Sequence, residues 1–307
     1  MEFLKFLQGL RNPVLDSFFS LITYFGDGML FIVIGLLFYW CISKKKGYYI
    51  LSVGLLGTVI NQFLKLVFRI PRPWVLDPEF QIVESARKAA GGYSFPSGHT
   101  QSSVGMFASI FLGTKKTWLK IVCVTLCILV PFSRLWLGVH TPLDVGVSFI
   151  IALVLVFGLY PIFEKGNKTN IRILYTCMIA LTVAFMIYVH AYTFPEDIDQ
   201  TNLAGGIKNA YKMLGCVAGM WCAYEVDTNY TKFETKAAVY IQVLKIVLGL
   251  IPVILIKSLI KKPLNALIGV DYIADGVMYF LICIFAGTLW PMTFKFFNKI
   301  GKKTGDK

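Results

Sequence analysis

Two long apolar runs joined by a short polar turn decide the fold of this chain: LKIVCVTLCILVPFSRLWLGVHTPLDVGVSFIIALVLVFGLYPIF, residues 119–163. Each run is close to the roughly 20 residues that an α-helix needs to cross a bilayer. The whole chain is 56% hydrophobic and only 15% charged, whereas about a quarter of the residues in an average soluble domain are charged. The sequence therefore predicts an all-α, polytopic transmembrane helical bundle.

Working outward from this stretch gives further apolar runs on both sides. The expected spans are 28–43, 48–68, 99–113, 119–139, 143–163, 172–193, 208–224, 238–260 and 273–296. Residues 3–25 are amphipathic and are interrupted at Asn12-Pro13, which indicates a short interfacial helix followed by a helix on, or dipping into, the membrane. Because the motif-like polar residues precede residue 165, we expect a functional core at 1–165 and about four accessory helices at 166–307.

The net charge of +13 is concentrated in loops. Basic clusters at 44–46, 115–116 and 165–172 lie between apolar runs, and basic loops mark the cytoplasmic side of a membrane protein. This orientation places the loops at 69–98, 134–142 and 194–207 outside. One segment opposes it, because Lys257, Lys261 and Lys262 would also be outside. No separate basic domain with interleaved aromatic residues indicates a nucleic-acid partner.

Seven cysteines are present, and most of them lie inside apolar runs. Cys123 and Cys127 are one helical turn apart, but no histidine lies near them in that run, so helix packing is the favoured interpretation. We therefore expect no disulfide framework, no metal site and no cofactor.

Polar residues that an apolar bundle would not need gather at the expected outer face. Lys65, Arg72 and Arg134 supply three cations, and the fork of an arginine matches phosphate oxygens. Ser97-Gly98 opens an apolar run, where the free N–H groups of a helix N-terminus favour an anion and a glycine lets the backbone approach it closely. These five residues predict a phosphate-binding site.

Two of the three histidines also belong to this set. Asp144 follows His140 by four residues, about one helical turn, so its carboxylate can accept the Nδ1 proton and leave Nε2 free to attack phosphorus. His99 is then the expected general acid, and afterwards the base that activates water. The predicted catalytic residues are therefore His140, His99 and Asp144.

The three sequence segments that carry these residues together resemble the signatures of the type 2 phosphatidic acid phosphatase superfamily. Its K-x6-R-P signature is matched by Lys65 to Arg72-Pro73, its P-S-G-H signature by Pro96 to His99, and its S-R-x5-H-x3-D signature by Ser133-Arg134, His140 and Asp144. The resemblance covers about residues 13–160. It implies an integral membrane lipid phosphatase that forms a phosphohistidine. Phosphatidate, phosphatidylglycerol phosphate, sphingoid-base phosphates and polyprenyl diphosphates are substrates of the family's membrane branch.

Simpler interpretations exist for individual residues. Thr141-Pro142 and Ser97 have the character of helix starts, and Lys65 could extend to the lipid headgroups. Asn61 could orient Lys65 or make a helix–helix hydrogen bond. A vanadate-dependent oxidase, or a transporter or non-catalytic binder of lipid phosphates, would use a similar pocket. The accessory helices could form the contact of a homo-oligomer. We also expect a location in a bacterial plasma membrane, with the site at its outer face.

Overall fold

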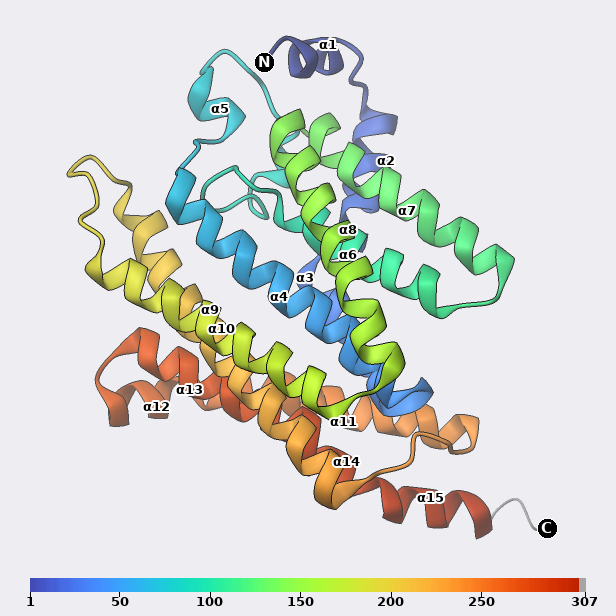
Figure 1. Cartoon of the computed structure of the whole chain (residues 1–307). Coiled ribbons are helices and arrows are strands. Elements are labelled where there is room, and N and C mark those ends of the chain that lie inside the picture. Colours follow the sequence, from blue (N-terminus) through green and yellow to red (C-terminus); the bar gives the residue numbers. More distant parts are fainter. Residues whose placement is uncertain (304–307) are drawn as a thin grey trace. The chain divides into compact units, whose positions relative to one another are not determined.

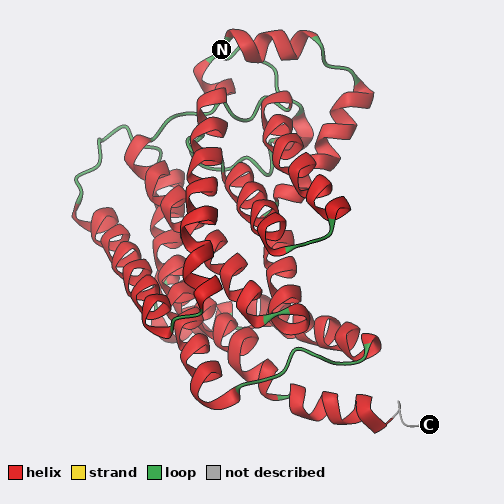
Figure 2. Ribbon diagram, turned by 45° about the vertical axis from the view of Figure 1, so that its right-hand side comes forward, coloured by secondary structure: helices red, strands yellow, loops and turns green. Residues whose placement is uncertain are grey.

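The computed structural model describes residues 1–303, with side chains placed through residue 298, and the regular structure in this part is helical (Figures 1 and 2). Six helices are long and apolar enough to cross a membrane, and α2 with α3 could form a seventh, bent span. The prediction of an all-α transmembrane bundle is confirmed. Helices occupy every expected span, but α6 is only 16 residues long and α10 carries several charges.

The chain divides into two compact units. The first comprises residues 1–32, 52–161 and 195–206, and the second comprises 33–51, 162–194 and 207 onward. The helices of the first unit are α1 (Glu2–Gly9), α2 (Pro13–Ile22), η1 (Thr23–Gly26), most of α4 (Lys44–Phe68), α5 (Pro73–Leu76), η3 (Glu84–Ala86), α6 (Gly98–Gly113), α7 (Thr117–Trp136) and most of α8 (Pro142–Lys165).

The second unit contains the remaining helices. They are η2 (Phe38–Ile42), α9 (Lys168–Ala191), most of α10 (Gln200–Val226), η4 (Asp227–Thr231), α11 (Val239–Leu259), α12 (Lys261–Ile268), α13 (Asp271–Ile284), η5 (Phe285–Leu289), α14 (Trp290–Met292) and α15 (Phe294–Lys303), with α3 (Gly28–Leu37) divided between the units. The functional core at 1–165 and the accessory helices at 166–307 stay a prediction.

Within the second unit, ion pairs compensate Lys261, one of the three lysines that opposed the predicted orientation. Lys261 Nζ lies 3.0 Å from a carboxylate oxygen of Asp275 and 3.6 Å from one of Asp271. Lys212 of α10 also approaches Asp275, at 3.6 Å. Because Asp275 is buried, these pairs reduce the cost of placing charge among apolar helices.

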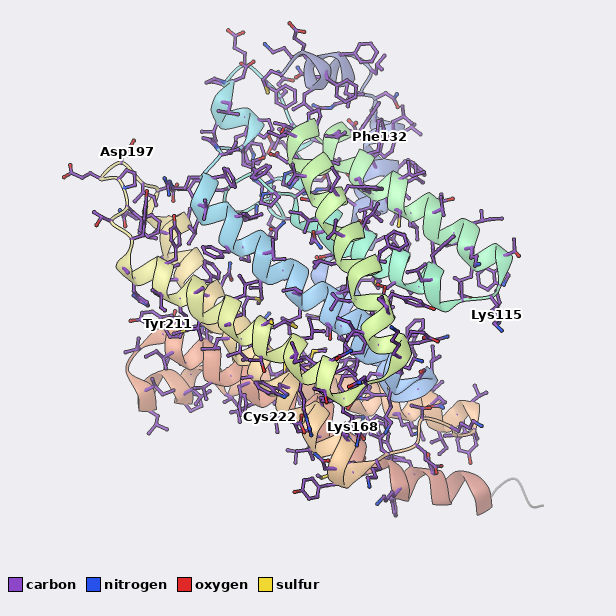
Figure 3. The ribbon with its side chains drawn as sticks, viewed as in Figure 1. Lys115, Phe132, Lys168, Asp197, Tyr211 and Cys222 are labelled. Atoms are coloured by element: carbon purple, nitrogen blue, oxygen red, sulfur yellow. The ribbon has the colours of Figure 1, made fainter. Side chains whose placement is uncertain are left out.

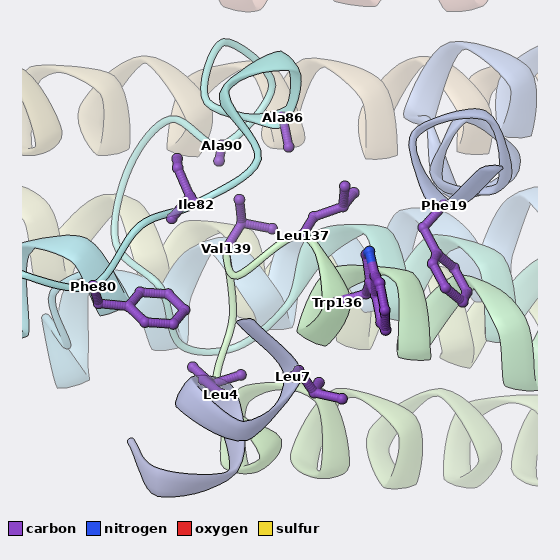
Figure 4. Packing of buried hydrophobic residues seen from close by; sticks show 10 residues of the cluster. All are labelled: Leu4, Leu7, Phe19, Phe80, Ile82, Ala86, Ala90, Trp136, Leu137 and Val139. Atoms are coloured by element: carbon purple, nitrogen blue, oxygen red, sulfur yellow. The ribbon is translucent and has the colours of Figure 1, made fainter. Parts of the chain in front are cut away.

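Helix α1 of the first unit packs on a hydrophobic cluster (Figure 4). Its Leu4 and Leu7 are buried, whereas Phe3 and Phe6 are exposed, so the amphipathic pattern has its buried stripe against protein. The cluster consists of Leu4, Leu7, Phe19, Phe80, Ile82, Ala86, Ala90, Trp136, Leu137 and Val139. It holds the loop before α6 against the end of α7, immediately next to His140.

Helices α4 and α6 pack in opposite directions, and glycines lie at their contacts. A Cβ placed on Gly105 would be 3.3 Å from Val53, and one placed on Gly57 would collide with the Gln101 side chain. One turn further, the Cβ position of Gly98 lies 4.0 Å from Asn61 Oδ1. This register brings the C-terminal end of α4 beside the N-terminus of α6.

Candidate active site

The predicted site residues all belong to the first unit, where four segments meet. Lys65 comes from the end of α4 and Arg72 from the segment that follows it. Ser97, Gly98 and His99 open α6, while Arg134, His140 and Asp144 come from the end of α7, the turn and the first turn of α8. Thr141 caps α8 by accepting the Asp144 N–H at 3.3 Å, as the sequence predicted.

His140 and Asp144 form a buried pair. Nδ1 of His140 lies 3.3 Å from Oδ2 of Asp144, and both side chains are at most 2% exposed. The same carboxylate oxygen accepts the Thr141 N–H at 2.7 Å and the Ser94 hydroxyl. Because an ionised carboxylate only accepts hydrogen bonds, we assign the imidazole proton to Nδ1. This tautomer leaves the lone pair of Nε2 available.

Arg72 contacts that lone pair. Its Nη1 lies 3.0 Å from His140 Nε2 and donates to the Val139 carbonyl at 2.8 Å, while Nε and Nη2 donate to the carbonyls of Gly92 and Gly91 at 3.0 and 2.8 Å. The guanidinium therefore ties the loop before α6 to the turn that carries His140. A phosphate that approached Nε2 would have to take over the Nη1 contact.

Arg134 presents unsatisfied donors inside the protein. Its side chain is fully buried, and Nη1 donates to Thr23 Oγ1 at 2.6 Å. Nε and Nη2 have no hydrogen-bond partner among the described residues. Because an unpaired buried cation is costly, these two N–H groups are suited to an incoming anion.

Lys65 and Ser97 are engaged in the structure. Lys65 Nζ donates to the backbone carbonyl of Tyr93 and lies 3.5 Å from that of Ser94. Ser97 Oγ accepts from the N–H of Thr100 at 3.4 Å and from its hydroxyl at 3.0 Å, so Ser97 is the N-cap of α6. The Ser97 N–H also donates to the Asp144 carbonyl at 3.2 Å, which fixes the start of α6 beside the start of α8.

Gly98 and His99 occupy the first turn of α6, where backbone N–H groups lack helical acceptors. The imidazole of His99 has no hydrogen-bond partner in the described part of the chain. Its backbone packs against η1, where a Cβ on Gly26 would lie 2.8 Å from the His99 carbonyl oxygen. Within the described part of the chain, no hydrogen bond joins the His99 and His140 side chains.

Sequence reasoning missed several residues that shape this site. They are Ser94, which donates to Asp144; Thr23, which binds Arg134; Arg11, which donates to the Trp136 carbonyl at 2.9 Å; and Gly138, whose φ is +76° in the turn before His140. A Cβ on Gly138 would lie 2.7 Å from Arg11. Only Gly138, which follows an apolar run, had a sequence signal, that of a helix C-terminus.

A cavity of about 640 Å³ adjoins the site, with Arg72 in its wall. It is lined by Phe68, Arg69, Pro71, Arg72, Trp74, Val75, Ala90, Gly92, Tyr93, Pro195, Asp197, Ile198, Asp199 and Asn202. The loop after α9, where Figure 3 labels Asp197, is thus part of the wall. A substrate phosphate at Arg72 would place its neighbouring atoms in this cavity.

The environment of His140 keeps its imidazole neutral. Burial lowers the pKa of His140 well below its ordinary value of 6.5, and the positive charges of Arg72, Arg134 and Lys65 lower it further. A neutral imidazole is the form that can act as a nucleophile. Among the described residues, no group of three His, Cys, Asp or Glu side chains is placed to hold a metal ion.

Protonation of His140 should therefore occur only under acidic conditions. In NMR spectra of isotope-labelled protein in detergent, we expect its imidazole to stay neutral at pH 6.5, where an ordinary histidine is half protonated. Replacing Arg72 with leucine should raise this pKa, because one positive charge is lost. His140→Asn would assign the signal. Half protonation of His140 at pH 6.5 in the unliganded protein would contradict this prediction.

Comparison with known proteins finds lipid phosphatases among the relatives of this chain. The chain matches the PAP2 superfamily over residues 45–168 and the transmembrane extension of PAP2 superfamily phosphatases over residues 211–303. It is 32% identical to undecaprenyl-diphosphatase BcrC of Bacillus subtilis over 163 residues, which cover 51% of this chain and 80% of that protein. It is 23% identical to sphingosine-1-phosphate phosphatase 1 of Mus musculus over 276 residues, 83% of this chain and 62% of that protein.

Among solved structures, the crystal structure of Aquifex aeolicus LpxE is 27% identical and covers 53% of this chain and 93% of that chain, with a TM-score of 0.45. Together, the family matches and the apolar helices identify the class of protein. The chain belongs to the PAP2 superfamily and is an integral membrane phosphoric ester hydrolase of the lipid phosphatase kind.

Proposed function

We propose that this chain hydrolyses a phosphate monoester or diphosphate of a lipid through a phosphohistidine at His140, without a metal ion. The observation that carries the proposal is the buried His140–Asp144 pair, in which Nδ1 faces a carboxylate oxygen and Nε2 faces the Arg72 guanidinium. Binding alone would not need an oriented imidazole, so this pair favours an enzyme over a transporter or a non-catalytic binder of lipid phosphates.

The first step forms the phosphohistidine. Nε2 of His140 attacks phosphorus, the bond from phosphorus to the lipid oxygen breaks, and His99 gives its proton to that oxygen. Asp144 stabilises the positive charge that develops on the imidazole. The non-bridging oxygens are held by Lys65, Arg72 and Arg134 and by the free N–H groups in the first turn of α6, such as that of Gly98. Ser97 caps this helix and fixes its start.

The second step releases phosphate. Water gives a proton to His99 and attacks phosphorus, the bond from phosphorus to Nε2 breaks, and its electron pair returns to the imidazole. One lipid phosphate and one water thus become a lipid alcohol, or a lipid monophosphate from a diphosphate, and inorganic phosphate. In this scheme the three cations Lys65, Arg72 and Arg134 provide the electrostatic stabilisation that a metal would otherwise supply.

The cavity beside Arg72 accounts for access by a lipid. Phe68, Trp74 and Val75 contribute apolar surface to its lining, while Arg69, Asp197 and Asp199 contribute charged groups. A lipid headgroup fits such a mixed surface. The charge of the loops supports an opening at the outer face of the membrane, which we propose to be a bacterial plasma membrane. Candidate substrates are phosphatidate, phosphatidylglycerol phosphate, a sphingoid-base phosphate and a polyprenyl diphosphate.

Phosphate release from these four lipids by purified protein in detergent tests the proposal. With a chelator present, we expect turnover of at least one lipid at an unchanged rate, because no step uses a metal. The ranking of the four by kcat/KM would identify the headgroup. An absence of turnover on every lipid, or activity that depends on an added divalent cation, would refute the proposal.

A further inference from the structure

A buried amide lies beside the N-terminus of α6 without any hydrogen-bond partner. Asn61 of α4 is 3% exposed, and neither its Oδ1 nor its Nδ2 is bonded to another described residue. A buried polar group that gains no hydrogen bond opposes folding. The fold therefore keeps an unsatisfied amide at this position of α4, and the neighbours of Asn61 indicate what the amide is for.

The register of α4 and α6 directs Asn61 toward the opening of α6. Asn61 Oδ1 lies 4.0 Å from the Cβ position of Gly98, whose N–H is among the unsatisfied groups of that helix N-terminus. Lys65, one turn along α4, reaches the Tyr93 and Ser94 carbonyls that precede α6. The same face of α4 thus offers an amide and an ammonium group to the space at the start of α6.

The expected helix–helix hydrogen bond of Asn61 is not made. Gln101 is the other amide in this contact, at the turn where it meets Gly57. Its Nε2 is also buried and without a partner, so the two amides do not satisfy each other. Only Asn61 lies at the end of α6 where the predicted phosphate-binding residues converge.

We infer that Asn61 is a further phosphate-binding residue, whose Nδ2 donates to a phosphate oxygen held at Ser97-Gly98-His99. The inference rests on the proposed function and adds a residue outside the three sequence signatures. Nitrogen and oxygen of an amide exchange places by a half-turn, so either assignment allows a donor to face Gly98. The unpaired Nε and Nη2 of Arg134 are donors for the same anion.

Asn61→Leu tests this role, and Gln101→Met is the matched control. Both replacements remove a buried, unpaired amide from the same helix contact, so both proteins should be at least as stable to heat as the wild type. We expect kcat/KM of Asn61→Leu to fall about 100-fold, the usual loss on removing one donor to developing charge. Gln101→Met should stay within about threefold of the wild type.

Binding of orthovanadate, measured calorimetrically, separates this inference from the proposed function. Asn61→Leu should weaken it at least about tenfold, whether or not the wild type turns over any lipid. The isosteric Asn61→Asp should weaken it more, because a carboxylate repels the anion. Unchanged binding in both Asn61 variants, no binding by the wild type, or an equal loss in Gln101→Met would each overturn the inference. A wild type that binds orthovanadate but hydrolyses no lipid would refute only the proposed function.

Discussion

Replacing His140 with alanine is expected to lower kcat by about 10⁴-fold or more on whichever lipid the wild type hydrolyses, because the atom that attacks phosphorus is lost. His140 is buried between Arg72 and Asp144, so we expect no neighbouring side chain to take over the position of Nε2. Phosphate release under saturating lipid measures the effect.

A second measurement makes this test specific for a covalent intermediate. Wild-type protein quenched with alkali during turnover of a ³²P-labelled lipid should retain label that acid removes, as a phosphoramidate does, and His140→Ala should retain none. His190→Ala is a suitable control, because that histidine lies in the second unit, hydrogen-bonded to Tyr211 at 3.0 Å. Turnover by His140→Ala at the wild-type rate would show that another group attacks phosphorus.

Replacing Asp144 with asparagine is expected to lower kcat about 10³-fold. This effect lies between the fall in kcat on removing one stabilising hydrogen-bond donor and the fall in kcat when a catalytic histidine is held in the wrong tautomer. The Thr141 N–H and the Ser94 hydroxyl both donate to Oδ2, so they should hold the amide oxygen in that place. Nδ1 would keep its acceptor, and the main loss would be the negative charge that stabilises a positively charged imidazole.

The same substitution should also destabilise the unliganded protein. Asp144 is fully buried near Lys65 and Arg72, and removing its charge leaves these two cations without this buried counter-charge. We expect a lower midpoint of thermal unfolding that inorganic phosphate partly restores. Ser94→Ala, which removes one hydrogen bond but no charge, should cost about 1 kcal/mol of stability and much less activity. Equal kcat values for Asp144→Asn and wild type would exclude the proposed role.

The all-α transmembrane class and the lipid phosphatase family could both be read from the sequence, because they depend on local properties. The apolar runs of α7 and α8 are long enough to cross a bilayer whatever their neighbours are. Thr141 and Ser97 cap α8 and α6 through contacts only three residues away. The His140–Asp144 pair likewise spans one helical turn.

The tertiary structure decided which donors are occupied and which are unpaired. Arg72 was expected only to bind phosphate, yet in the structure it holds three backbone carbonyls and His140. Ser94 and Thr23, which contact Asp144 and Arg134, lie 50 and 111 residues from their partners. Such pairs leave no periodic signal in a single sequence, because they arise only when distant segments pack together.

For this protein, the sequence by itself determined the helical class, the three signatures and the type of chemistry, since each of these depends on residues within a few turns of one another. Only the packing of α1, α4, α6 and α7 decided how these groups are presented. It placed Asn61 beside Gly98 and left two Arg134 donors free. The physical reason is that hydrogen-bond satisfaction is a property of buried neighbours in space, which a linear pattern does not record.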